Sequence, residues 1–198
     1  MQKKNEQTMN RIFKSAEDLF SEKDFHDVKI EEIAKNAEVG KGTIYTYFKS
    51  KEDLLFQCLT HNVEEHQKGF SKIINSDQDF KSILRKVFDY MYAFFREKAP
   101  LIQRIMTLMP KLKLSETDIN KARQMFQNGL NDSSKFFQRG IDEGIITNSM
   151  TSRQIAIIFQ KMFDFNVLFG FYGEPEMSVE DCYRFFTKTF FKQELQNE

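Results

Sequence analysis

The residues best able to do chemistry gather in one short segment, residues 41–51. Thr43, Tyr45 and Tyr47 carry hydroxyl groups there, and Lys41 and Lys51 carry ammonium groups, with no acidic residue between positions 39 and 51. Hydroxyls and ammonium groups on one exposed helix face donate hydrogen bonds to phosphates and base edges of duplex DNA. The segment therefore predicts a nucleic-acid interface.

Two short helices joined by a tight turn are expected to position this segment. Apolar residues recur at helical spacing over 30–37, and Gly40 then suits a turn or a helix start. A second helix over 43–48 would point Ile44 and Phe48 inward, because residues four apart share a face. Ser50, with Asp53 as its capping-box partner, predicts the start of a further helix. This arrangement is a helix-turn-helix, which places its second helix in the major groove.

The histidines and cysteines give weaker patterns. His61 and His66 are five residues apart and diverge by about 140° around a helix, so a solvated helix face is favoured over a metal site. Cys58 and Cys182 form no disulfide framework. Cys182 is open to interpretation as a redox sensor or as a small buried residue, and the second is favoured. No metal is expected.

Asp164 leaves three interpretations open: contact with a cationic ligand, a place at a helix edge, or an ion pair with a basic residue such as Arg104. Elsewhere the chain shows neither a nucleophile beside a base nor a pair of carboxylates spaced for acid–base catalysis. We therefore expect no enzymatic activity and no cofactor.

Composition favours an all-helical protein. The chain has 198 residues with 22 Phe, no Trp, only 8 Gly and 3 Pro, and a formal net charge of +0. Few helix breakers with much Phe, Met, Lys and Glu are typical of helical proteins. The polar N-terminus predicts no signal peptide, and charged residues interrupt the longest apolar region, 155–171, so no membrane span is expected. The expected location is the cytoplasm.

The helical periodicity divides the rest of the chain. Residues 1–8 are expected to be disordered, and helices are expected over 8–21, 51–74, 80–98, 100–109, 116–143, 151–171 and 178–193. Caps support several of these ends, among them Gly144, Thr151 or Ser152, and Ser178. We expect a DNA-binding domain over 1–50 and a helical effector-binding and dimerisation domain over 51–198.

The last two expected helices are apolar on more than one face, which predicts burial against a second copy of the chain. The expected interface of this homodimer consists of Phe159, Phe163, Val167, Cys182, Phe186 and Phe190.

Phe and Met residues are unusually frequent between positions 80 and 171, and such side chains repack around irregular apolar shapes. They predict a pocket for an apolar or amphipathic small molecule, although a solid aromatic core is an equally open interpretation. The candidate effector-binding residues are Phe88, Met91, Phe95, Met106, Phe126, Phe159, Met162, Phe163 and Asp164.

The pattern formed by Ile33-Ala34, Ala37, Val39, residues 42–48 and Lys51 resembles the DNA-binding signature of the TetR family of bacterial transcriptional regulators. The resemblance covers the N-terminal part of the chain and implies an all-α fold that dimerises through its last two helices. It also implies a set of DNA contacts, in which Lys51 meets a phosphate at a helix N-terminus. The implied residues are Lys29, Lys41, Gly42, Thr43, Tyr45, Thr46, Tyr47 and Lys51.

Three positions depart from that pattern, which commonly has Thr at Lys29, Gly at Glu38 and Ser at Gly40. Glu38 would cost about 1 kcal/mol in a left-handed turn. The resemblance implies a ligand-responsive DNA-binding regulator, here interpreted as a repressor that a small apolar effector releases from a double-stranded (pseudo)palindromic operator. The alternative is a helical effector-binding or interaction protein without operator binding, of which the three departures would be symptoms.

Overall fold

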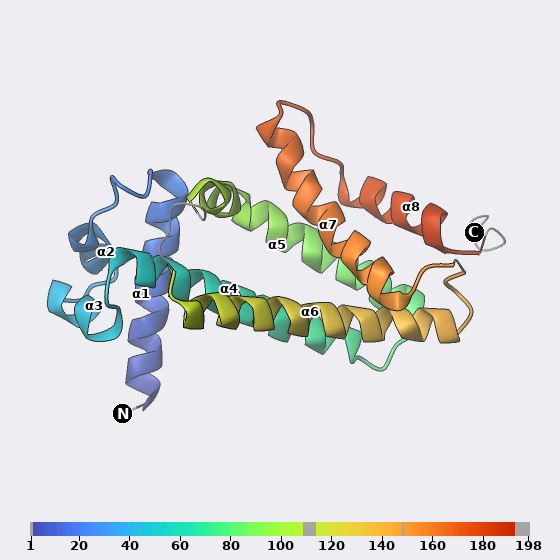
Figure 1. The fold of residues 1–198 in the computed structure, drawn as a ribbon, viewed down its shortest axis with the longest axis horizontal. Coiled ribbons are helices and arrows are strands. Elements are labelled where there is room, and N and C mark those ends of the chain that lie inside the picture. Colours follow the sequence, from blue (N-terminus) through green and yellow to red (C-terminus); the bar gives the residue numbers. More distant parts are fainter. Residues whose placement is uncertain (1, 109–113, 148, 193–198) are drawn as a thin grey trace. The chain divides into compact units, whose positions relative to one another are not determined.

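The computed structural model describes residues 2–108, 114–147 and 149–192, and they form an all-α fold (Figure 1). The helices are α1 (Gln2–Glu22), α2 (Ile30–Asn36), α3 (Lys41–Tyr47), α4 (Lys51–Ile74), α5 (Phe80–Leu108), α6 (Glu116–Asp142), α7 (Ser152–Phe171) and α8 (Val179–Phe190). The predicted fold class is confirmed.

Several helix ends follow the caps read from the sequence. Ser178 accepts a hydrogen bond from the backbone N–H of Asp181 at the start of α8. Thr151, rather than Ser152, accepts from Gln154 N–H at the start of α7. Gly144 follows α6 with a φ of 69°, a conformation that glycine adopts without a Cβ penalty.

Two expectations about helix ends are wrong. α1 begins at Gln2, so residues 2–7 are helical rather than disordered. α5 runs through Pro100 without a break, where two separate helices were expected. Proline removes one backbone donor from a helix interior, but Leu101 beside it is 97% buried in an apolar cluster, and that burial favours the continuous helix.

The chain divides into two compact units. The first comprises residues 1–64 and 100–119, and the second comprises residues 65–99 and 120–198. α4, α5 and α6 each contribute residues to both units, so the units do not divide at the expected boundary between 50 and 51. The reason is local packing, because Leu54, Leu55 and Cys58 of α4 belong to the core of the first unit.

The first unit has a core drawn from the inner stripe of α1, both short helices and the start of α4. Ile12, Ala16 and Ile33 are completely buried, and Ile44 and Phe48 are nearly so. Ser15 is buried among them and donates its hydroxyl hydrogen bond to the carbonyl of Ile33, which ties α1 to α2. The spacing of the apolar residues thus packs α2 and α3 against α1 and the start of α4.

The second unit has an aromatic core. Phe88 lies at its centre, with the rings of Phe159, Phe163, Tyr183 and Phe186 within 5.2–5.7 Å of its own, centroid to centroid. Aromatic rings at such distances, mostly edge to face, add stability beyond the burial of their area. This core therefore joins α5, α7 and α8.

Candidate DNA-binding interface and helical core

The helix α3 presents a polar face away from its core. Ile44 and Phe48 are 99% buried, whereas Lys41, Gly42, Tyr45 and Thr46 are exposed, with Tyr45 half exposed. Thr43 and Tyr47, also expected to contact DNA, are partly buried at the edges of this face. Ile44 and Phe48 point inward and Tyr45 points outward, as expected from the sequence, whereas Thr43 and Tyr47 are less exposed than expected; the exposed set is suited to phosphate contact.

The turn between α2 and α3 holds Glu38 in a left-handed backbone conformation, with a φ of 54°. Its backbone N–H donates to the carbonyl of Lys35, and the N–H of Val39 donates to the carbonyl of Ala34. Position 38 is where the family commonly has glycine, and an L-residue in this conformation costs about 1 kcal/mol. The left-handed turn considered from the sequence is thus present.

The two short helices begin without side-chain caps. Lys29 is the N-cap residue of α2 and Gly40 that of α3, both with extended backbones, and neither makes a side-chain cap hydrogen bond. Serine or threonine at an N-cap stabilises a helix by about 1 kcal/mol relative to a residue without a suitable oxygen, and glycine is only slightly worse than serine. All three departures from the family pattern therefore remove a local stabilising contact or add backbone strain at a helix junction.

Lys41, expected to reach DNA, forms an ion pair with Glu31 of α2. The hydrogen bond between them raises the pKa of the Lys41 ammonium and lowers the pKa of the Glu31 carboxyl. Both side chains are more than half exposed, so water screens the attraction and the pair can open toward a phosphate. Lys29 is exposed as well.

Lys51 is placed differently from the other lysines. Its ammonium donates to the backbone carbonyls of Phe25 at 2.6 Å, Val28 at 2.8 Å and His26 at 3.4 Å. It also lies 4.5 Å from the centroid of the Phe25 ring. The ammonium is therefore occupied within the first unit, an arrangement that the sequence resemblance did not suggest.

The start of α4 is capped nearly as predicted. The hydroxyl of Ser50 accepts a hydrogen bond from the backbone N–H of Asp53 at 3.1 Å. The carboxylate of Asp53 accepts from the N–H of Lys49 at 2.7 Å, one residue before the position of a standard capping box. The connection between α3 and α4 is thereby fixed.

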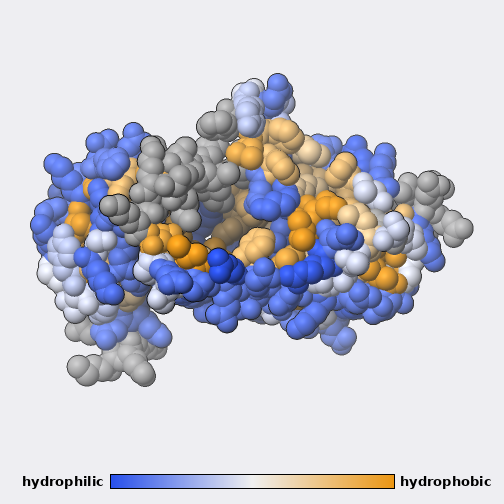
Figure 2. All heavy atoms as spheres, viewed as in Figure 1, coloured by the Kyte–Doolittle hydropathy of each residue, from blue (hydrophilic) through white to orange (hydrophobic). Residues whose placement is uncertain are grey.

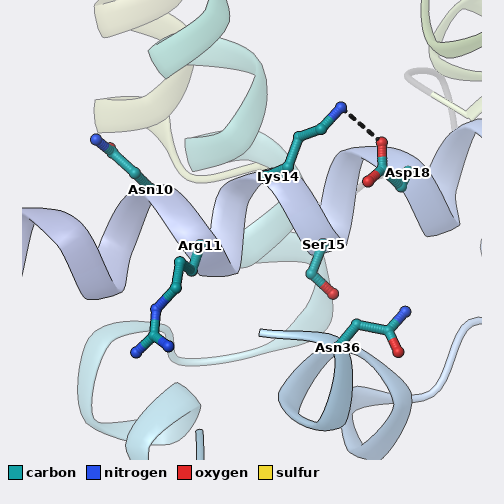
Figure 3. A pocket seen from close by; sticks show the side chains of 6 residues that line it. All are labelled: Asn10, Arg11, Lys14, Ser15, Asp18 and Asn36. Atoms are coloured by element: carbon teal, nitrogen blue, oxygen red, sulfur yellow. Dashed lines mark hydrogen bonds and ion pairs between the residues drawn. The ribbon is translucent and has the colours of Figure 1, made fainter. Parts of the chain in front are cut away.

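A shallow polar recess lies between α1 and α2, lined by Asn10, Arg11, Lys14, Ser15, Asp18 and Asn36 (Figure 3). Lys14 is paired with Asp18 at 2.9 Å, and Arg11 with Glu38 at 3.2 Å. The basic groups of this recess are balanced by acids, and all six residues that line it are polar or charged, so it does not suit an apolar effector.

The candidate effector-binding residues fall into two groups. Phe88, Met91, Phe159 and Phe163 are buried and pack together, with Phe95 stacked on Phe163 at 5.9 Å and Met162 packed against this core. Phe126 is 48% exposed and lies apart from this cluster, 5.8 Å below the Lys161 ammonium. The side chain of Met106 lies outside the described residues.

Asp164 forms an ion pair with Lys161, one turn away on α7, at 2.6 Å. The side chain of Arg104, considered as its partner, lies outside the described residues. An i,i+3 pair of partly exposed groups is typical of a helix surface. Of the three interpretations of Asp164, the ion pair with a basic residue and the place at the helix edge both have observed support, with Lys161 as the partner.

The expectation of a solvated face is wrong for His66, which is largely buried, whereas His61 is partly exposed and partly packed on an aromatic ring. His61 stacks on Phe13 at 4.7 Å, and His66 stacks between Tyr90 at 5.0 Å and Phe94 at 3.8 Å. Within the described part of the chain, the buried Nδ1 of His66 has no hydrogen-bond partner. Burial lowers the pKa of His66 to about 4, so the ring is neutral. In the sequence, the spacing of four residues between His66 and the apolar Phe70 on the same helix is the signal that could have placed His66 on the inner face.

The expected dimer-interface residues need correction. Phe159, Phe163, Cys182, Phe186 and Phe190 are all at least 99% buried within a single chain, so a partner cannot reach them. Val167 has a side chain outside the described residues. The helical periodicity indicated two apolar faces on these helices, but the residues expected at the dimer interface lie on the face that packs inside the chain.

The apolar side chains that α7 and α8 leave exposed are different residues. Ile157, Phe165 and Phe185 are 40%, 60% and 53% exposed, and Figure 2 shows apolar side chains gathered over these two helices. These three side chains, rather than the buried ones, are large apolar groups of α7 and α8 that a partner could contact.

Both cysteines are completely buried thiols outside any disulfide. Burial raises the pKa of the Cys182 thiol to about 11, which keeps it protonated and unreactive. The packing interpretation of Cys182 is the one that this environment supports.

No helix in the described ranges is both long enough and apolar enough to cross a membrane.

Comparison with known proteins follows the same division. Residues 12–58 match the family described as bacterial regulatory proteins, tetR family. An HTH-type transcriptional regulator of Staphylococcus aureus (strain MRSA252) is 24% identical over 167 residues, which cover 84% of this chain and 86% of that protein.

Solved structures share the fold over nearly the whole chain. The regulator FadR from Bacillus subtilis, in complex with stearoyl-CoA, has a TM-score of 0.69 at 21% identity, covering 90% of this chain and 95% of that one. A transcriptional regulator from Saccharomonospora viridis, in complex with choline, has a TM-score of 0.75 at 16% identity, covering 93% and 98%. With its helix-turn-helix and its helical second unit, the chain is similar to the TetR family of bacterial transcriptional regulators over residues 12–58, and it shares the fold of these solved regulators over nearly its whole length.

Proposed function

We propose that this regulator binds a two-fold symmetric operator as a homodimer and that a small apolar or amphipathic effector releases it. The observation that carries the DNA-binding part is the face of α3, where Lys41, Gly42, Tyr45 and Thr46 are exposed over a fully buried Ile44. A short, exposed helix with hydroxyls and no acid on its own length fits the major groove and its flanking phosphates.

The homodimer is supported by three exposed apolar side chains, those of Ile157 and Phe165 on α7 and of Phe185 on α8. Two copies joined there would each present one α3, and a two-fold dimer binds half-sites about 34–36 Å apart or a multiple of that distance.

The effector class rests on the aromatic and methionine side chains of the second unit. Met91 and Met162 border the cluster of Phe88, Phe95 and Phe163, and flexible thioether side chains adapt to an alkyl chain. The stearoyl-CoA complex of the structurally similar regulator from Bacillus subtilis supports an acyl chain as the first class to try. The choline complex makes a small cation the second class, but Asp164 already pairs with Lys161.

Release requires the effector to bind the DNA-incompetent state more tightly. A preference of about 100-fold, or ~3 kcal/mol, suffices for an effective switch, and operator DNA must then weaken effector binding by the same factor. α4 is the natural carrier, because its residues 51–64 belong to the first unit and its residues 65–74 to the second.

The test of operator binding is a salt titration with a duplex from the regulator's own upstream region. A DNA-binding protein loses affinity linearly in log salt, with a slope of about −0.9 per phosphate contact. Equal, weak binding to this duplex and to a shuffled one at every salt concentration would favour the helical interaction protein instead. Calorimetry with an acyl-CoA, with and without operator, then tests the effector, and identical affinities would exclude that ligand as the inducer.

A further inference from the structure

We propose that Lys51 positions the DNA-binding helices by fastening the first residue of α4 to the loop before α2, and that it does not bind a DNA phosphate. The proposal rests on operator binding only for its affinity measurements, because its structural consequences can be measured on the free protein.

The ammonium of Lys51 uses all of its hydrogen-bonding capacity inside the protein. A lysine ammonium has three N–H donors, and three carbonyls accept from this one, those of Phe25, His26 and Val28. The charge also lies 4.5 Å from the centroid of the Phe25 ring, a favourable cation–π distance. A phosphate would have to displace contacts that are already made.

The loop that Lys51 holds leads directly into the helix-turn-helix. Phe25 and Val28 are buried at 6% and 1% exposure, and the next residue, Lys29, is the N-cap of α2. The carbonyl of Lys29 accepts from the N–H groups of Glu32 and Ile33 and so begins that helix. The position of the loop therefore sets where α2 starts.

Without Lys51, the carbonyls of Phe25 and Val28 would lose partners in a partly buried place, where unpaired carbonyl groups are unfavourable. The loop would then detach from α4. Because α4 also supplies residues 65–74 to the second unit, a movement of α4 reaches the DNA-binding helices through this attachment.

The deciding variants are Lys51→Arg and Lys51→Met, with Lys49→Met as the matched control. Lys49 lies two residues earlier in the sequence and has an exposed side chain. An arginine binds phosphate at least as well as lysine, but its planar fork does not suit three carbonyls converging on one nitrogen. A phosphate contact would therefore survive Lys51→Arg, and a fastening contact would not.

We expect Lys51→Arg and Lys51→Met to weaken operator binding about tenfold or more while leaving the salt slope unchanged, because no phosphate contact is lost. Lys49→Met should instead leave folding unchanged. In the free protein, both Lys51 variants should speed amide hydrogen exchange at residues 27–33 and lower the thermal midpoint by about 3 °C or more.

Parental affinity and parental exchange in Lys51→Arg, or a salt slope reduced by about one unit in Lys51→Met, would overturn the proposal. If Lys51→Met does not fold, Lys51→Arg decides, since it retains the charge. If the parent binds no operator, faster exchange at residues 27–33 still supports the fastening role, and unchanged exchange refutes it, separately from the proposed function.

Discussion

The carboxylate of Glu38 lies 3.2 Å from the guanidinium of Arg11, and the same Glu38 holds the left-handed backbone of the helix-turn-helix at a φ of 54°. The two features have opposite effects on stability. The ion pair is exposed, with 48% of the Arg11 side chain and 82% of the Glu38 side chain open to solvent, and such pairs contribute roughly 0–1 kcal/mol. The backbone conformation costs about 1 kcal/mol or more, so it outweighs the ion pair.

Glu38→Gly is therefore expected to stabilise the protein by about 1 kcal/mol, because glycine adopts a positive φ without a Cβ clash. Denaturant unfolding measures the change. Arg11→Gln, which removes the ion pair but not the strain, should change stability by less than about 0.5 kcal/mol. A loss of stability in Glu38→Gly comparable to that in Arg11→Gln would mean that the ion pair dominates.

Lys29→Thr is expected to stabilise α2 by about 1 kcal/mol by providing the missing N-cap oxygen. Gly40→Ser should add only a few tenths of a kcal/mol at α3, and it is accommodated because the nearest atom to an added Cβ is Thr43 Oγ1 at 3.7 Å. Lys29→Ala removes the same charge without supplying a cap. Equal unfolding free energies for Lys29→Thr and Lys29→Ala would show that no cap forms.

Glu31→Gln is expected to strengthen operator binding and to steepen the salt slope by up to about one unit, because it frees the Lys41 ammonium for a phosphate. Lys41→Ala should weaken binding. A double-mutant cycle checks the mechanism: in the Lys41→Ala background, Glu31→Gln should have a smaller effect. An undiminished effect there would assign the gain to the general loss of a negative charge.

The helix-turn-helix could be predicted closely, because its signals are local. Spacing placed Ile44 and Phe48 inside, and Ser50 and Ser178 marked helix starts, since a cap acts within three residues of itself. The expected break at Pro100 is wrong because it relied on a local rule as well. The burial of Leu101 in the core of the first unit, which involves residues far away in the sequence, favours a continuous helix instead. The hydrogen bonds of Lys51 could not be predicted from the sequence, because the carbonyls that accept them lie 23–26 residues earlier in the chain.

Acid is expected to destabilise the second unit through His66. Its pKa is lowered from 6.5 to about 4 by burial, so the unfolded chain takes up a proton at a higher pH than the folded one. The contribution of the neutral ring is complete above about pH 6.5 and is lost as the pH falls toward about 4, by at most about 3 kcal/mol.

His66→Phe tests this expectation, because phenylalanine retains the stacking on Tyr90 and Phe94 but cannot take up a proton. Unfolding free energies of the two proteins are compared across that pH window. Carboxylates contribute equally to both curves, so their difference isolates His66. Parallel curves would show that the ring is solvated when the protein is folded.

The proposed dimer makes adjacent phenylalanines of α8 behave differently. Phe185 is 53% exposed, whereas Phe186 is completely buried, 5.5 Å from the centroid of Phe88. Phe185→Asp is expected to produce a folded monomer, because a carboxylate inside an apolar interface without a partner costs several kcal/mol. Phe186→Asp places the same charge in the core and should unfold the second unit.

Sedimentation and circular dichroism distinguish these outcomes. Thr189→Asp lies four residues from Phe185 on the same exposed face of α8, so it should weaken the dimer as well. A parent that sediments as a monomer at micromolar concentration would remove the basis for the dimer. A Phe185→Asp variant that stays dimeric would instead place the interface on another face of the chain, because a buried unpaired carboxylate there is too costly to tolerate.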